Sequence, residues 1–218
     1  MQPHLYLEDT YLFEVKTTVA ESGDGERGPW LRLADNIFHP QGGGQPSDVG
    51  TVDGLPVQPF RDQGAGEHTV LLSADRALDT GLATTARIDP QVRRRHAALH
   101  TCGHVVDGFV RALGFEHVVS NHFPGQARIE FKVGDVRPDL EKLAASVEAQ
   151  TNSAIAANRK VSAEQRDGQR FVLVDGLGED PCGGTHVAGL AQLTGFSLRS
   201  VKIKSGTLKI GYTVEHTD

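Results

Sequence analysis

The chain has 218 residues and a mass of 23.5 kDa, a size that fits one large domain or two small ones. Its 25 glycines follow no period of three, no apolar run approaches the roughly 18 residues of a membrane span, and two cysteines cannot form a disulfide framework. Collagen-like, membrane-spanning and disulfide-rich classes are therefore excluded. The first residues lack a basic and then apolar secretory pattern, so we expect a cytoplasmic globular protein with no membrane partner.

The charge is distributed unevenly along the chain. Residues 1–90 hold six Lys and Arg against fourteen Asp and Glu, a balance of −8, and the remaining residues carry +2, which gives the net charge of −6. This asymmetry predicts two parts with different roles. A net negative charge excludes strong nonspecific binding to nucleic acid, although a small basic patch can still recognise a nucleic acid.

The first ninety residues contain short apolar and β-branched runs separated by turn residues, a pattern typical of a small β-barrel. Strands are predicted at residues 5–19, 30–33, 36–38, 50–52, 68–72 and 82–88, with a turn at residues 21–25. Asp89 precedes a proline, which disfavours the helical region, so we place a domain boundary after it.

Residues 90–218 alternate between helical and strand periods and predict an α+β domain with a mostly antiparallel sheet and flanking helices. The predicted helices span residues 92–113 and 140–158, and the predicted strands span residues 127–133, 171–174, 196–204 and 208–214. The last two strands form a hairpin. The apolar positions of its first strand change phase near Arg199, which predicts a β-bulge there.

Three histidines lie four residues apart on the first predicted helix: His96, His100 and His104. Successive members are turned only ~40° about the helix axis, so two neighbouring imidazoles can reach one metal ion. Cys102 is turned ~200° from His100 and points away from that pair. The spacing leaves His96 and His104 as alternative partners of His100, and surface histidines on a helix would show the same spacing.

The second cysteine lies in a short segment with another histidine. Cys182 and His186 are separated by Gly183, Gly184 and Thr185, and the glycines allow a positive-φ backbone that could turn both side chains toward one ion. A free cysteine is often only a small buried apolar residue. A thiolate with three imidazoles is a normal tetrahedral zinc set, however, and the two groups together predict a metal site.

A glycine-rich loop in the N-terminal half is the third feature. Gly42, Gly43 and Gly44 are followed by Gln45, and their bare backbone could approach a ligand closely. No GK[ST] sequence or following helix completes a phosphate-binding loop. The spacing alone favours a tight turn of the barrel.

Together these segments resemble the AlaX family, freestanding proteins related to the editing domain of alanyl-tRNA synthetase. The resemblance rests on the glycine-rich loop (GGGQP), on HTxxH at residues 100–104 and on CGGTH at residues 182–186, and it covers nearly the whole chain. The last two motifs also occur in the editing domain of threonyl-tRNA synthetase, whereas GGGQP points to the alanyl branch. The resemblance implies an N-terminal β-barrel domain (1–89) and a zinc-binding editing domain (90–218).

The resemblance also implies an activity and a ligand set. The activity is hydrolysis of the ester that joins serine, or glycine, to the acceptor end of tRNA(Ala). One zinc ion per chain would be held by His100, His104, Cys182 and His186, which leaves His96 outside the motif. Gly103 lies where alanine is more common in the family, and we expect it to permit close packing beside the site at a helix cost of up to ~1 kcal/mol.

Four protein ligands would close a tetrahedral zinc. Zinc could then take a fifth ligand and orient water or the substrate's amino group, or hold the pocket while backbone amides act, and the sequence leaves both routes open.

Thr101 and Asn121 are the catalytic candidates. Serine differs from alanine by a hydroxyl, which a hydrogen-bonding pocket can recognise. The candidates for substrate binding are Ser120, Gly42, Gly43, Gly44 and Gln45. Ser120 and Asn121 could equally form a plain loop before a strand.

The start of the first predicted helix is basic. Arg93, Arg94 and Arg95 could meet phosphates of the tRNA acceptor stem, or they could form a solvated helix start.

Two other functions compete with editing of tRNA(Ala): a zinc-stabilised tRNA-binding module without chemistry, and a zinc hydrolase of another aminoacyl ester.

Overall fold

The computed structural model describes residues 2–61, 69–134 and 137–217. It contains two compact units, one formed by Met1–Gly42 with Pro46–Arg94 and the other by Gly43–Gln45 with Arg95–Asp218. The tip of the glycine-rich loop therefore belongs to the second unit. The domain division predicted at residue 89 stays a prediction.

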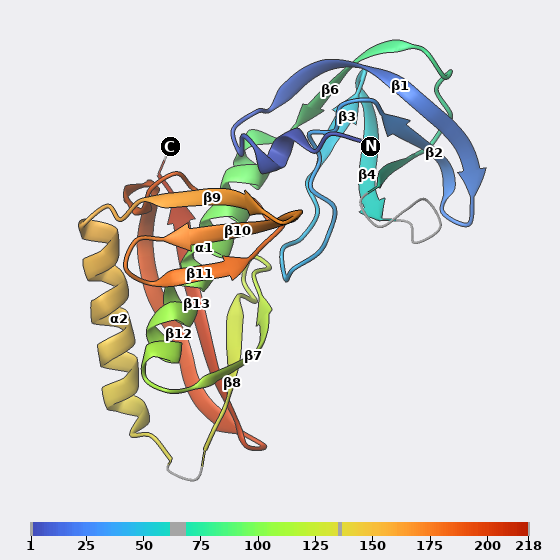
Figure 1. Cartoon of the computed structure of the whole chain (residues 1–218). Helices are drawn as coiled ribbons and strands as arrows, with labels where there is room; N and C mark the ends of the chain where they lie inside the picture. The colour runs from blue at the N-terminus through green and yellow to red at the C-terminus, as the bar shows by residue number, and fades with distance from the viewer. Residues whose placement is uncertain (1, 62–68, 135–136, 218) are drawn as a thin grey trace. The chain divides into compact units, whose positions relative to one another are not determined.

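The first unit is built on a closed antiparallel barrel with the strand order β1-β2-β5-β4-β3-β6 (Figure 1). Its strands are β1 (Glu14–Gly25), β2 (Gly28–Leu33), β3 (Gly50–Val52), β4 (Leu55–Arg61), β5 (Val70–Ala74) and β6 (Ala83–Ile88). Apolar side chains at alternating strand positions fill its core, among them Leu31, Leu33, Val70, Leu72 and Ala86. The barrel sheet agrees with the pattern of short strands in the sequence.

Several details of the predicted barrel are wrong. Leu5–Leu7 is a short 3-10 helix (η1), and β1 continues through the predicted turn because Gly23 pairs with Trp30 of β2. Residues 36–38 form no named strand. The sequence also gave no sign of β4, whose two prolines weaken a strand pattern. Of the strand predicted at residues 68–72, residue 68 lies outside the described residues.

The second unit has two antiparallel sheets, with the orders β12-β13-β8-β7 and β11-β10-β9. Its helices are α2 (Leu140–Ala156) and most of α1 (Pro90–Ala112), and its strands are β7 (Glu116–Asn121), β8 (Arg128–Lys132), β9 (Val161–Arg166), β10 (Gln169–Val174), β11 (Gly178–Pro181), β12 (Leu193–Lys204) and β13 (Thr207–His216). Side chains of both helices and both sheets share one apolar core. The mixed content and the antiparallel sheets agree with the predicted α+β class.

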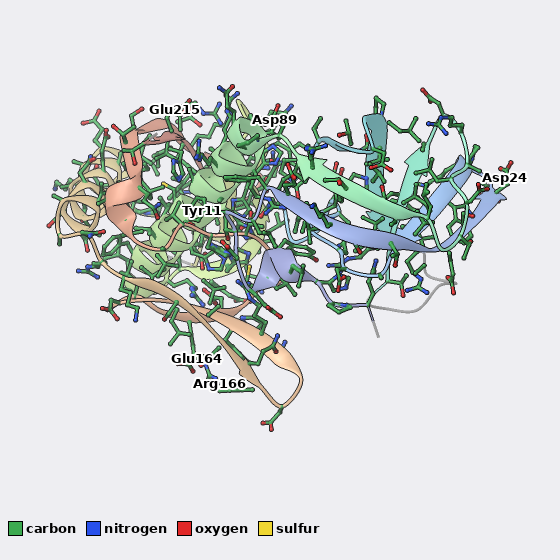
Figure 2. The ribbon with its side chains drawn as sticks, turned by 90° about the horizontal axis from the view of Figure 1, so that it is seen from above. Tyr11, Asp24, Asp89, Glu164, Arg166 and Glu215 are labelled. Carbon is green, nitrogen blue, oxygen red and sulfur yellow. The ribbon has the colours of Figure 1, made fainter. Side chains whose placement is uncertain are left out.

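The ends and irregularities of these elements have local causes. The side chain of Asp89 accepts hydrogen bonds from the backbone N–H groups of Gln91 and Val92 and so caps α1 (Figure 2). The register of β12 shifts between Leu198 and Ser200, which confirms the predicted bulge. β7 was not predicted, because its first four residues are exposed and no alternation marks it. No helix in the described part of the chain is long and apolar enough to span a membrane.

The first of the three helix-start arginines is a structural residue. Arg93 is fully buried in the first unit, and its guanidinium makes two hydrogen bonds to Asp48, Nε–Oδ1 at 2.9 Å and Nη2–Oδ2 at 2.5 Å. It also donates to the carbonyl oxygens of Thr10 and Ile37. A tRNA contact and a solvated position are therefore both wrong for Arg93. Arg95 is exposed.

Candidate metal centre

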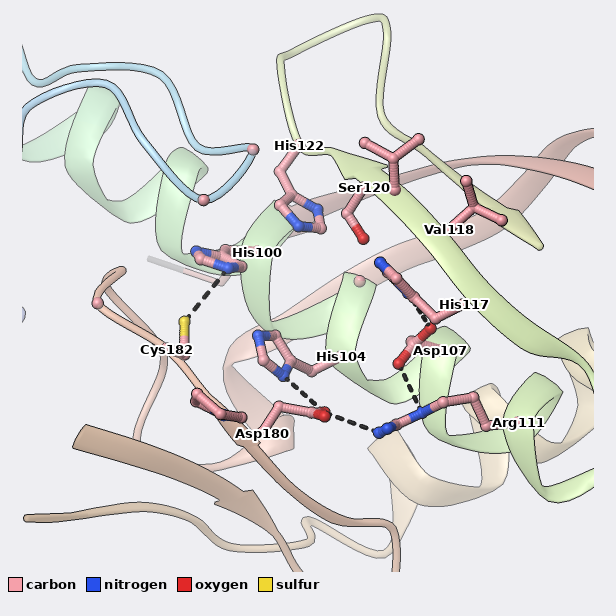
Figure 3. Close-up of a pocket in the computed structure, with 16 residues that line it drawn as sticks. His100, His104, Asp107, Arg111, His117, Val118, Ser120, His122, Asp180 and Cys182 are labelled. Atoms are coloured by element: carbon pink, nitrogen blue, oxygen red, sulfur yellow. Dashed lines mark hydrogen bonds and ion pairs between the residues drawn. The ribbon is translucent and has the colours of Figure 1, made fainter. Parts of the chain in front are cut away.

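Four residues that the sequence predicted as ligands converge in the second unit. One ligand atom from each of His100, His104, Cys182 and His186 lies within 4.8 Å of the others. The two helix histidines lie one turn apart on α1, and Cys182 follows directly after β11 (Figure 3). His96 is buried and lies outside this cluster, so His104 is the partner of His100.

The spacing of the donor atoms fits a tetrahedral metal ion. The Cys182 sulfur lies 3.5 Å from Nε2 of His100 and 3.2 Å from Nε2 of His186. In a tetrahedron with Zn–S and Zn–N bonds of about 2.3 and 2.05 Å, a sulfur and a nitrogen ligand are about 3.6 Å apart. One thiolate with three imidazoles also suits zinc chemically. The residues present therefore fit a zinc ion.

Gln45 fixes the orientation of the first histidine. Its Oε1 accepts a hydrogen bond from the Thr185 backbone N–H at 3.0 Å, which identifies that atom as the oxygen of the amide. The same oxygen lies 2.7 Å from Nδ1 of His100, so Nδ1 carries the proton and Nε2 keeps a lone pair toward the cluster. This is the outer hydrogen bond that metal-binding histidines normally make.

The other two histidines have similar outer contacts. The hydroxyl of Thr101 lies 3.1 Å from Nδ1 of His186, and it also accepts the backbone N–H of Val187. Nδ1 of His104 lies 3.5 Å from the Asp180 carboxylate. Each imidazole of the cluster therefore has a polar partner at Nδ1, which leaves Nε2 for a metal.

The charges around His104 favour a cation. Burial disfavours its charged form, yet contacts with Asp180 and Cys182 raise the pKa of His104 to about 9. Burial would raise the pKa of Asp180, but His104 and Arg111 lower it below its ordinary value. Asp180 is thus held as a carboxylate, and its field stabilises positive charge at the cluster.

Gly184 and Gly103 are needed for space rather than for a positive-φ backbone. Gly184 has no positive φ, so the expected positive-φ turn is wrong, but a Cβ there would lie 2.2 Å from Cε1 of His100. A Cβ at Gly103 would lie 2.3 Å from Cε1 of His122. Gly103 therefore permits close packing beside the site, as expected.

A pocket of about 560 Å³ opens beside the cluster. Its lining includes Gly43, Gly44, His100, His104, Ser120 and His122 (Figure 3). This volume lies within the usual range of small-molecule sites. Of the predicted substrate-binding residues, Gly43, Gly44 and Ser120 thus lie at the pocket, Gln45 lies behind His100, and Gly42 belongs to the first unit.

Neither predicted catalytic residue is among those that line the pocket. Thr101 is fully buried and orients His186, as described above. The Asn121 side chain accepts the backbone N–H of Phe123 at 2.9 Å and so shapes the turn after β7. Their positions suit residues that hold the site in place.

One wall of the pocket carries a chain of ionisable residues that sequence analysis missed. Asp107 binds His117 at 2.6 Å and Arg111 at 2.8 Å, and Arg111 binds Asp180 at 2.8 Å (Figure 3). Only the spacing of four residues between Asp107 and Arg111 was visible in the sequence. This network holds the carboxylate that faces His104.

Replacement of Gln45 by alanine is expected to weaken zinc binding by about 10- to 100-fold, because loss of an outer hydrogen bond frees the tautomer and orientation of His100. Competition with a metal chelator measures this change. Gln45→Glu is the matched control, since it keeps an acceptor for both His100 and the Thr185 N–H, and it should retain most of the affinity. Equal zinc affinity of Gln45→Ala and the unchanged protein would contradict the assignment.

No protein-family model matches the chain. It is 26% identical to the alanyl-tRNA editing protein AlaX-M of Pyrococcus horikoshii over 197 residues, which cover 88% of each chain. It is also 26% identical to the AlaX-M protein of Methanosarcina mazei over 238 residues, 94% of this chain and 92% of that protein. A match of 26% to the alanine–tRNA ligase of Korarchaeum cryptofilum covers 96% of this chain and 26% of the ligase. The similarity covers most of this chain and most of each AlaX-M protein, and the HTxxH and CGGTH residues of this chain gather in one site. The chain is therefore a relative of the AlaX-M alanyl-tRNA editing proteins.

Proposed function

We propose that the protein is a cytoplasmic trans-editing deacylase that hydrolyses the ester of Ser-tRNA(Ala), and of Gly-tRNA(Ala) with it. One observation carries this proposal: the HTxxH and CGGTH motifs meet at the edge of a pocket large enough for an aminoacyl group. The names of the relatives support an alanyl-tRNA as the substrate class. The proposed editing domain is the second half of the chain, residues 90–218.

We assign one zinc ion per chain to His100, His104, Cys182 and His186. When bound, zinc supplies a Lewis acid that can take a fifth ligand and orient water or the substrate's amino group. Gln45 contacts Nδ1 of His100, and Thr101 contacts Nδ1 of His186, so outer hydrogen bonds orient two of the proposed ligands. Because these contacts are buried, the cluster is pre-organised before a substrate enters.

The pocket lining suits recognition of a small polar amino acid. The Gly43 and Gly44 backbone and the Ser120 side chain border it, and a Cβ at Gly44 would lie 2.7 Å from the Ser120 carbonyl oxygen. The loop tip and β7 therefore meet without a gap on this side of the site. We propose that Ser120 and the two glycines contact the aminoacyl group, while Asn121 shapes the turn that carries them.

A panel of seryl esters tests this function against its two alternatives. The metal-replete protein is expected to release serine from Ser-tRNA(Ala) much faster than from Ser-tRNA(Ser) or serine methyl ester. Binding of tRNA(Ala) without any hydrolysis would support a non-catalytic module instead. Equal hydrolysis of all three esters would support a zinc hydrolase with another substrate.

A further inference from the structure

His122 is a buried histidine of the pocket that belongs to no motif. It follows β7, is only 3% exposed, and lies among the pocket-lining residues (Figure 3). Its ring stacks on that of His100, with centroids 4.5 Å apart and planes 25° apart. It contributes no atom to the candidate metal cluster. Such a side chain, beside a ligand but outside the ligand set, is placed to contact what the pocket binds.

A hydrogen-bond chain fixes the tautomer of this ring. The Tyr212 hydroxyl donates its proton to the carbonyl oxygen of Leu99 at 2.9 Å. Nδ1 of His122 lies 2.6 Å from the same hydroxyl oxygen. Because that hydroxyl has already used its only proton, Nδ1 must be the donor. In the neutral ring, Nε2 therefore holds a lone pair and acts as a hydrogen-bond acceptor.

Two glycines leave room for the His122 ring. Nε2 is bonded to Cε1 and Cδ2 of the imidazole. A Cβ at Gly103 would lie 2.3 Å from Cε1 and 2.6 Å from Nδ1, and a Cβ at Gly44 would lie 3.0 Å from Cδ2. Both glycines line the pocket with His122. A side chain at Gly103 would displace the ring from its bond to Tyr212, and a side chain at Gly44 would collide with the Ser120 carbonyl and press on the ring.

We propose that Nε2 of His122 accepts a hydrogen bond from the side-chain hydroxyl of the seryl group and so distinguishes serine from alanine and glycine. This inference rests on the proposed function. A buried acceptor that is paired by a serine hydroxyl is left without a partner by an alanyl or glycyl group, and that loss disfavours the smaller residues. Two hydrogen bonds hold the acceptor in place. Nδ1 of His122 binds the Tyr212 hydroxyl, and the His122 backbone N–H donates to the Gly44 carbonyl oxygen at 2.8 Å.

Two variants separate the two nitrogens of the ring. His122→Asn keeps an amide N–H near the position of Nδ1, so it can still donate to Tyr212, but it has no atom at the position of Nε2. His122→Gln can place its amide oxygen near the position of Nε2. Affinities of the full-length, zinc-loaded protein are measured by calorimetry for seryl, alanyl and glycyl 3′-amides of 3′-amino-3′-deoxyadenosine. These amides resist hydrolysis, so the measurement does not depend on turnover.

His122→Asn is expected to reduce the preference for the seryl over the glycyl amide by about tenfold, the equivalent of about 1.4 kcal/mol. His122→Gln should retain more of this preference, and both variants should keep the wild-type zinc content. An unchanged preference in His122→Asn would overturn the proposal. An equal loss of affinity for all three amides would also overturn it, because the acceptor would then bind the shared amino group or only support the pocket. If the wild-type protein binds the seryl amide selectively but releases no serine from tRNA, the proposed function fails while this inference stands.

Discussion

Replacement of Cys182 or His104 by alanine is expected to remove stoichiometric zinc and deacylation together. The thiolate of Cys182 would be the only anionic ligand of the set, and His104 is the proposed ligand whose Nδ1 faces Asp180. A zinc ion left with three protein ligands loses a bond and the rigidity of a closed tetrahedral site. Elemental analysis of the purified variants should give less than roughly a tenth of the wild-type zinc content.

The chain offers a matched control for each of these variants. Cys102 is the other cysteine and lies in the apolar core of the second unit, and His96 lies two turns before His104 on α1. Cys102→Ala and His96→Ala should both keep about one zinc per chain. Stoichiometric zinc in both Cys182→Ala and His104→Ala would show that the cluster is not the metal site.

Replacement of Arg93 by alanine is expected to lower the free energy of unfolding of the first unit by about 3–5 kcal/mol. The loss would leave Asp48, which is only 1% exposed, as a buried carboxylate without its cation. The carbonyl oxygens of Thr10 and Ile37 would also lose the hydrogen bonds that Arg93 donates. A buried charge without its partner costs far more than the loss of a surface ion pair.

The single tryptophan of the chain makes this effect measurable. Trp30 lies on β2 of the barrel, so its fluorescence during urea unfolding follows the unit that contains Arg93. Arg95→Ala is the control, because that arginine is exposed two positions further on, and its change should stay within about 0.5 kcal/mol. A change of similar size in both variants would contradict a structural role for Arg93.

The gathering of the four candidate ligands could be expected from the sequence because the local geometry of the helix controls half of it. Four-residue spacing on a helix puts His100 and His104 on one face whatever surrounds them. The choice between His96 and His104 could not be made from spacing, since both lie one turn from His100. The fold brings His104, and not His96, together with Cys182, which lies about eighty residues away in the chain.

The contacts that support the cluster could not be predicted from the sequence, because they also join residues that lie far apart in the chain. Gln45 was predicted as a substrate-binding residue because it follows three glycines, yet its amide binds His100 and Thr185, which lie 55 and 140 positions away. Nothing in the sequence marked His122, because β7 is exposed along most of its length and shows no alternation. The pairing of Arg93 with Asp48 was hidden by the two further arginines beside it.

The most direct test of the account is the deacylation of Ser-tRNA(Ala) and Ala-tRNA(Ala) by the same metal-replete protein under single-turnover conditions. A pocket that pairs the serine hydroxyl and leaves a buried acceptor unpaired with alanine predicts rapid release of serine and little release of alanine. Loss of the serine signal in Cys182→Ala would tie the reaction to the cluster. Equal release of the two amino acids, or no release of serine from tRNA(Ala), would contradict the account.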